Sequence, residues 1–104
     1  MDIAVVGVGI RVTFRRETTV CQDLRLVLGA VAPTPMRARG SERMAAGREL
    51  DDVLIEEISR MASEEARPIS DVRSTAGYRK SLVTALTRRV LLAARDWAEK
   101  GGRR

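Results

Sequence analysis

The chain has 104 residues, of which 44% are hydrophobic, and this length allows one domain with a core of its own. It has one cysteine and no histidine, which excludes an internal disulfide, a zinc site and a catalytic histidine. No apolar run approaches the ~20 residues of a membrane-spanning helix, and the N-terminus does not have the layout of a secretory signal. A single unpaired cysteine is typical of a reducing compartment, so the sequence predicts a cytoplasmic protein.

The net charge is +5, but its sign alternates along the chain. Residues 1–50 and 68–104 are basic, whereas residues 51–67 are acidic. Nucleic-acid-binding proteins concentrate their basic residues in one stripe, so this alternation argues against a nucleic-acid partner. It suits either docking onto neighbouring protein surfaces or charge compensation between helices of one domain.

The first predicted element is a strand over Ile3–Phe14, in which every even-numbered residue is apolar. A period of two is typical of a strand with one buried face. Gly7 and Gly9 fall on the other face, where they either allow a partner to approach the backbone or mark a bend or bulge. They do not form a dinucleotide-binding fingerprint, because a third glycine and a following helix are missing.

A polar turn at Arg15–Thr19 leads to a second predicted strand over Val20–Ala30, and the two strands are expected to form an antiparallel hairpin. The residues expected to face the core are Val20, Leu24, Leu26 and Leu28. Cys21 is expected on the opposite face, together with Asp23 and Arg25, as a semi-exposed and inert thiol.

Two prolines follow the second strand and exclude a helix there. Pro33 and Pro35 fix their own backbone torsion, favour extended backbone before them, and have no N–H group for a neighbouring strand. We therefore expect a short edge strand around Thr34–Ala38.

Helix signals begin after this strand. A short helix is predicted from Gly40 or Ser41 to Ala46, with Gly47 at the position that stops it. A second helix is predicted from the acidic residues at 51 and 52 up to Pro68.

A long third helix is predicted after Ser74, which is a suitable N-cap. The apolar stripe expected to be buried is Tyr78, Leu82, Ala85, Leu86, Val90, Ala93 and Trp97. Strands first and helices afterwards predict an α+β domain, with about three helices packed on one face of a small three-stranded antiparallel sheet. This domain would span residues 1–100, followed by a disordered tail at 101–104.

Two groups of polar residues are candidate sites. The first group is Asp51, Asp52, Glu56 and Glu57. Acid–base catalysis needs carboxylates in a closed cleft, so an acid-rich helix start is better explained as a solvated face. The second group is Asp71, Arg73, Tyr78 and Arg79. These residues either brace the start of the third helix or dock a partner subunit, and no catalytic residue is assigned.

Three motifs, in this order, resemble those of a known family. They are Asp2-Ile3-Ala4 with its valine-rich strand, the segment LGAVAPTPMRA at residues 28–38, and ISDVR at residues 69–73 with Tyr78-Arg79 and Arg88-Arg89 after it. Together they resemble the C-terminal domain of the FAD-binding (medium) subunit of molybdenum hydroxylases, the carbon monoxide dehydrogenase and xanthine dehydrogenase family.

The resemblance implies a part in an oxidoreductase. In this family a molybdenum cofactor lies in a large subunit, and electrons pass through two-iron two-sulfur clusters in a small subunit to FAD in the medium subunit. The C-terminal domain would pack against the FAD-binding domain, in the same or a separate chain, and against the iron–sulfur and molybdenum subunits. Alone, it is expected neither to bind FAD tightly nor to catalyse a reaction.

The resemblance also implies roles for individual residues. Ile3 and Val5 would lie near the flavin. The residues that would pack against the other domain or subunits are Pro33, Pro35, Arg37, Asp71, Arg73, Tyr78 and Arg79. Gly40 and Gly77 stand where the family usually has helix formers, and the glycine-rich FAD-binding part has no counterpart in this chain, which would be one domain of a longer polypeptide, an excised domain or part of a split gene.

Two other functions stay open on the sequence alone. An isoelectric point near 10.6 and an arginine-rich last helix are compatible with a stand-alone basic binding module, for RNA among other ligands. A non-catalytic homodimer could form through the proline-containing edge or through exposed helix faces.

Overall fold

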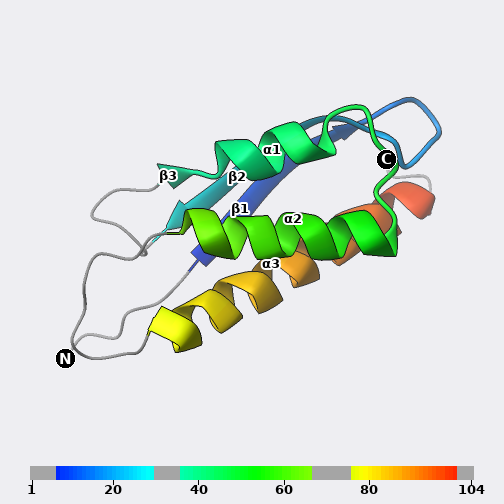
Figure 1. The fold of residues 1–104 in the computed structure, drawn as a ribbon. Coiled ribbons are helices and arrows are strands. Elements are labelled where there is room, and N and C mark those ends of the chain that lie inside the picture. Colours follow the sequence, from blue (N-terminus) through cyan, green and yellow to red (C-terminus); the bar gives the residue numbers. More distant parts are fainter. Residues whose placement is uncertain (1–6, 30–35, 67–75, 101–104) are drawn as a thin grey trace.

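The computed structural model describes residues 7–29, 36–66 and 76–100, and in the last stretch it describes side chains from residue 81 onward. The elements are β1 (Gly7–Phe14), β2 (Cys21–Gly29), β3 (Met36–Arg37), α1 (Arg39–Ala45), α2 (Asp52–Glu65) and α3 (Ala76–Glu99). The strands form one layer and the helices form a second layer against it (Figure 1). The predicted α+β architecture, with strands first and helices afterwards, is confirmed.

β1 and β2 form the predicted antiparallel hairpin, in which Gly7 pairs with Gly29 at one end and Thr13 with Asp23 near the other. The even-numbered residues of β1 are half-buried and the odd-numbered ones are exposed, as the alternation predicts. β3 pairs with β2 on the other side, so the strand order is β1-β2-β3 and the short third strand is an edge strand, as predicted.

The alternation of β2 breaks near its start because of a β-bulge. Thr13 pairs with Asp23, but the next residue, Phe14, pairs with Cys21. Gln22 is therefore an extra residue, which moves Cys21 to the other face of the strand. Cys21 is fully buried with the leucines, so the prediction that it faces away from the core is wrong. Burial raises the pKa of its thiol to about 11, which keeps the thiol protonated and inert at neutral pH.

The first two helices begin and end close to the predicted residues. Gly47 follows α1 with φ of 77°, a left-handed conformation that glycine adopts readily, and its N–H donates to the carbonyl of Cys21 at 2.7 Å. α2 begins after Asp51, whose side chain accepts the N–H of Leu54 at 2.8 Å. Pro68, the predicted stop of α2, lies outside the described residues.

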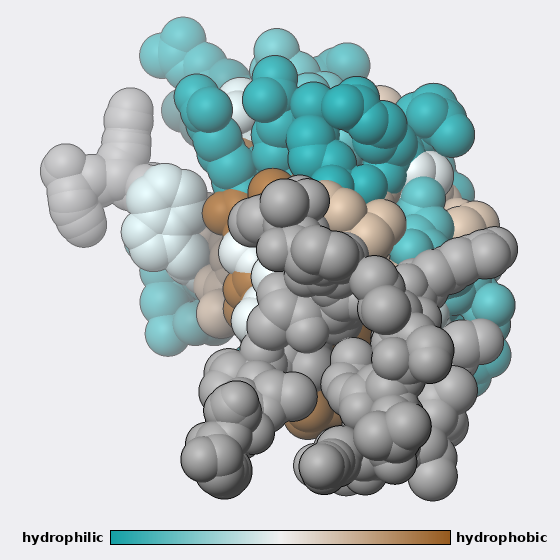
Figure 2. Space-filling model, turned by 90° about the vertical axis from the view of Figure 1, so that its left-hand side faces the viewer, coloured by the Kyte–Doolittle hydropathy of each residue, from teal (hydrophilic) through white to brown (hydrophobic). Residues whose placement is uncertain are grey.

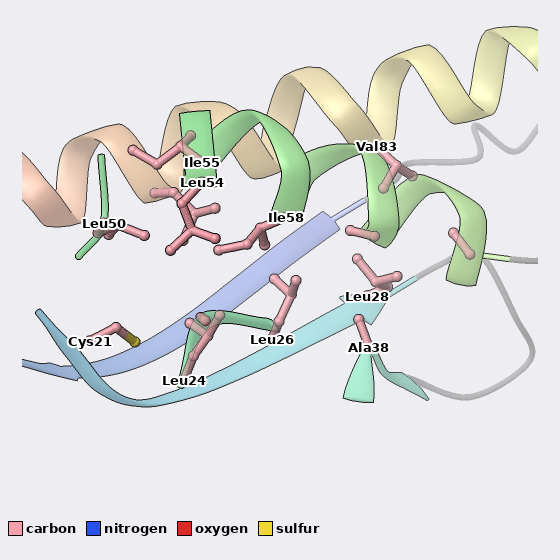
Figure 3. Close-up of a cluster of buried hydrophobic side chains, with 14 residues drawn as sticks. Cys21, Leu24, Leu26, Leu28, Ala38, Leu50, Leu54, Ile55, Ile58 and Val83 are labelled. Atoms are coloured by element: carbon pink, nitrogen blue, oxygen red, sulfur yellow. The ribbon is translucent and has the colours of Figure 1, made fainter. Parts of the chain in front are cut away.

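The core lies between the sheet and the helices (Figure 3). The labelled leucines of β2 point toward the leucine and isoleucines of α2 and toward Val83 of α3. The largest fully buried apolar side chains are Leu26, Leu28, Leu50, Leu54, Ile55, Ile58, Leu91 and Val83. Aliphatic side chains from both layers thus make one continuous core.

α3 buries a face that only partly overlaps the predicted stripe: Leu82 and Leu86 of the stripe are partly buried against the core. Val83, Thr87 and Leu91 are fully or almost fully buried, whereas Ala85 and Ala93 are exposed and Trp97 is 56% exposed. Apolar residues occur on nearly every side of this helix, so their spacing alone did not single out one face. The helix instead turns toward the core the residues that fit against α2 and β1.

Candidate functional site

Among the described elements, the helices cover one face of the sheet and none covers the other. Within residues 7–29, 36–66 and 76–100, all helices pack against the face that carries the leucines of β2. We call the other face the open face; on β1 and β2 it consists of Gly7, Gly9, Arg11, Thr13, Asp23, Arg25, Val27 and Gly29. A sheet face that no described element covers is a candidate for packing against another domain.

One half of the open face is mostly backbone, with three glycines and one valine on β1 and β2. Gly7 pairs with Gly29, and Gly9 pairs with Val27. A Cβ added at Gly7 or Gly9 would meet nothing within 4 Å, so these glycines are not required by neighbours inside the chain. The ladder is regular from Gly7 to Thr13, and the bulge lies elsewhere. Of the two alternatives for these glycines, close approach by a partner therefore fits better than a bulge.

The other half of the open face is charged. Arg11 pairs directly with Arg25, and Thr13 pairs with Asp23. Both arginines are exposed, and within the described part of the chain neither guanidinium has a hydrogen-bond or ion-pair partner. Like charges directly opposite each other destabilise an antiparallel pair.

At the β3 edge, a carboxylate from α1 accepts hydrogen bonds from β2 and β3. Glu42 is 8% exposed, and its Oε2 accepts the backbone N–H of Leu26 at 2.8 Å and the Nε–H of Arg37 at 3.1 Å. Its Oε1 accepts from Nη2 of Arg37 at 2.6 Å. Burial on its own raises the pKa of Glu42, but the hydrogen bonds from Arg37 and Leu26 outweigh it, so the pKa lies below the usual range. Arg37, the predicted packing residue, thus has a partner within its own domain.

Another carboxylate caps the same short helix from a distance. Glu65, at the end of α2, accepts the N–H of Gly40 at 2.6 Å through Oε2. Its Oε1 accepts the N–H of Ser41 at 3.0 Å and the hydroxyl of Ser41 at 2.7 Å. A Cβ at position 40 would lie 2.6 Å from Oε2 of Glu65, which gives a physical reason for glycine at this place. The sequence did not indicate this contact, because the partners lie far apart in the chain.

The acidic start of α2 holds helices together. Asp51 caps α2, and Asp52 accepts from Arg95 of α3 at 2.7 Å. Glu56 accepts from both Nε and Nη2 of Arg88 at 2.9 and 3.0 Å. Glu57 lies 3.6 Å from Arg48. These carboxylates therefore have structural partners, and two arginines of the last helix, which a basic binding module would need, are engaged within the chain.

Most of the residues that the resemblance singled out lie outside the described side chains. These are Ile3, Val5, Pro33, Pro35, Asp71, Arg73, Tyr78 and Arg79, of which the last two belong to α3 by backbone. The described ends of the elements that flank them lie at one end of the domain (Figure 1). These are the start of β1, the end of β2, the start of β3, the end of α2 and the start of α3. Seen from this end, described hydrophobic side chains come to the surface beside a hydrophilic region (Figure 2).

A sequence model of the CO dehydrogenase flavoprotein C-terminal domain matches residues 1–94. The chain belongs to this family. The resemblance carried by the three motifs is thereby confirmed, and the three-stranded sheet with its helices is the fold of this flavoprotein domain.

Similar proteins extend far beyond the matched region. The xanthine dehydrogenase FAD-binding subunit of Escherichia coli O157:H7 is 30% identical over 94 residues, which are 90% of this chain and 32% of that subunit. Aldehyde oxidase 4 of Rattus norvegicus is 30% identical over 95 residues, 90% of this chain and 7% of the oxidase. The chain therefore spans less than a third of the length of these relatives.

Solved structures share the fold. Quinoline 2-oxidoreductase from Pseudomonas putida 86 superimposes with a TM-score of 0.79 at 26% identity, covering 90% of this chain and 32% of that one. Reconstituted CO dehydrogenase from Oligotropha carboxidovorans gives a TM-score of 0.74 at 24% identity, covering 88% and 31%. At this identity the second likeness shows the fold alone.

The described residues do not by themselves fit FAD or a metal ion. The two glycines of β1 lie within a strand, whereas a pyrophosphate cradle needs glycines at a turn that opens a helix. Within the described ranges, no group of three metal-ligating side chains is close enough to hold an ion. None of the described helices is both long enough and apolar enough to cross a membrane.

Proposed function

We propose that this chain is the C-terminal domain of an FAD-containing electron-transfer subunit of a molybdenum hydroxylase. The family match over residues 1–94 carries the proposal. The similarity to a xanthine dehydrogenase FAD-binding subunit and to quinoline 2-oxidoreductase supports it. The domain serves by packing against the FAD-binding domain and partner subunits, and catalyses nothing alone.

The open face is the surface that meets the FAD-binding domain. Ile3 and Val5 precede β1 and share the odd-numbered parity of Gly7 and Gly9. If the strand continues toward the N-terminus, as the sequence predicts, these two residues extend the glycine half of the open face toward the flavin. Close approach over the glycines then brings the flavin-bearing domain next to Val5.

In the sequence, the remaining packing residues lie between β2 and β3, in β3, between α2 and α3, and in the first turns of α3. They are Pro33, Pro35, Arg37, Asp71, Arg73, Tyr78 and Arg79. We assign them to contacts with the FAD-binding domain or with the iron–sulfur and molybdenum subunits, which carry the two-iron two-sulfur clusters and the molybdenum cofactor. The location of such an assembly, which the single cysteine predicts to be cytoplasmic, stays a prediction.

The test is to purify the native protein from its source and to record its mass, visible spectrum and metal content. We expect a larger assembly with flavin absorbance, iron and molybdenum. A colourless protein of 11.5 kDa without those partners would contradict the proposal. The 104-residue chain itself, mixed with FAD and passed over gel filtration, is expected to retain no stoichiometric FAD.

A further inference from the structure

Arg11 and Arg25 are placed together by the backbone. They are directly opposite residues in the register of β1 and β2, which puts their Cβ atoms ~4.5–5.5 Å apart. Two positive charges at this separation repel each other and weaken the strand pair. The acidic residue on the same two strands, Asp23, is opposite Thr13 and bonds to neither arginine.

Other arginines of this chain have carboxylate partners, unlike Arg11 and Arg25. Arg37, Arg88 and Arg95 each donate to a carboxylate at 2.6–2.9 Å. The pKa of each of these three guanidinium groups is raised, chiefly by the hydrogen bond to its carboxylate. The Arg11–Arg25 pair has no such partner within the described chain, so a carboxylate from outside would remove its repulsion and supply the missing bonds.

The surroundings of the pair favour a protein partner that lies flat on the sheet. Gly9 follows the arginines along the same face, opposite half-buried Val27, and a Cβ on Gly9 would meet nothing within 4 Å, so a partner can approach the backbone of β1 closely there. A surface seated on the glycine half would carry its own side chains directly over the guanidinium groups. Arginine binds carboxylates through two parallel N–H groups, which fixes orientation as well as contact.

We propose that Arg11 and Arg25 together form a binding site for acidic side chains on the FAD-binding part of the subunit. This inference rests on the proposed function, which supplies the partner. The occupant is argued from charge complementarity and from the length of the relatives, since the chain accounts for only 32% of a matched FAD-binding subunit. The pair sets the orientation in which the two parts meet.

If the arginine pair serves binding, reversing one charge should not lower the stability of the domain. Arg11→Glu replaces a repulsive cross-strand pair by an attractive one, so the urea midpoint of the 104-residue chain is expected to stay unchanged or rise. The same substitution removes half of the acidic partner's site. Unchanged or raised stability with weakened docking separates a binding role from a structural one.

The experiment introduces Arg11→Glu and Arg25→Glu, singly and together, into the native assembly. The matched control is Arg43→Glu, which reverses an exposed arginine on α1, away from the open face. The fraction of FAD retained after gel filtration at two salt concentrations reports docking. We expect the double reversal to retain about tenfold less FAD than the wild type and the control. We also expect a charge reversal of the partner, Asp or Glu to Arg in the FAD-binding part, to restore retention.

Each outcome decides a different point. If the wild-type assembly contains no FAD-binding polypeptide, the proposed function fails and this inference fails with it. If the wild type and the double reversal retain FAD equally, the inference is overturned and the proposed function stands. If retention falls but no acid-to-base change in the FAD-binding part restores it, the carboxylate partner is wrong, and a phosphate of the bound FAD becomes the alternative anion.

Discussion

Single side chains hold this domain together at places that local sequence does not mark. Glu65, at the end of α2, caps α1. At the β3 edge, the side chain of Glu42 accepts the backbone N–H of Leu26. No local sequence pattern indicates the role of either carboxylate, since each side chain contacts another element. Their contributions are therefore best tested one residue at a time.

Removal of the distant cap is expected to destabilise the domain. Glu65→Ala should lower the free energy of unfolding by about 1–2 kcal/mol, because two backbone N–H groups and one hydroxyl lose their acceptor. Gly40→Ala should bring no gain in the wild type, since its Cβ displaces Glu65, but should stabilise by about 1 kcal/mol in the Glu65→Ala background. Urea denaturation of the four chains measures this, with Glu57→Ala as the control. Equal effects of Gly40→Ala in both backgrounds would refute the coupling.

A buried hydroxyl in α3 offers a stabilising change. The Oγ1 of Thr87 is buried and has no hydrogen-bond partner in the described structure. Thr87→Val should raise the free energy of unfolding by about 1 kcal/mol, because the unmet hydrogen bond is removed at constant shape. Thr84→Val, at a half-buried position one turn away, is the control and should change little. A thermal or urea midpoint lowered by Thr87→Val would show that the hydroxyl is bonded after all.

At the scale of elements, the interfaces between strands and helices set the details that periodicity leaves undecided. The bulge at Gln22 turns Cys21 into the core, and packing against α2 and β1 selects the buried face of α3. The contact at the β3 edge and the buried face of α3 can be tested separately.

The sheet edge is expected to make the domain sensitive to acid. The pKa of Glu42 is lowered in the folded state, so its contribution to stability is present above the usual carboxyl pKa of ~4.3 and is lost as the pH falls below it. Glu42→Gln should cost about 1–3 kcal/mol at pH 7 and less at pH 3. Denaturation across this pH range measures the difference. Arg37→Lys, which keeps the charge but not the two-pronged contact, should fall between the wild type and Glu42→Gln.

The buried face of α3 can be tested by truncation. Leu91 is fully buried and Trp97 is 56% exposed. Leu91→Ala should therefore cost about 2–5 kcal/mol, whereas Trp97→Ala should cost clearly less despite the larger side chain. The stripe predicted from the sequence buries Trp97 and therefore requires the opposite order of the two losses. A larger loss of stability for Trp97→Ala than for Leu91→Ala in chemical denaturation would support that stripe.

At the scale of the whole molecule, basic charge is divided between internal pairing and exposure. Arg88 and Arg95 bind Glu56 and Asp52, so the last helix does not present a continuous basic stripe. The chain is therefore expected to show no measurable RNA binding at ~50 mM salt. Fluorescence anisotropy with a labelled single-stranded RNA checks this. Tight binding that falls steeply with salt would revive the basic-module alternative.

The class of the fold, the order of its elements and the family follow from the amino-acid sequence. The local signals are the alternation in Ile3–Phe14, the prolines at 33 and 35, and the acidic helix start at Asp51 and Asp52. They can be read from the sequence because backbone torsion, period and the charge at a helix end depend on near neighbours. The other features come from contacts between segments that are distant in the sequence. The placement of Cys21, the buried side of α3 and the Glu65 and Glu42 contacts depend on atoms brought together by folding. The Arg11–Arg25 pair needed the strand register, which a bulge of one residue is enough to change.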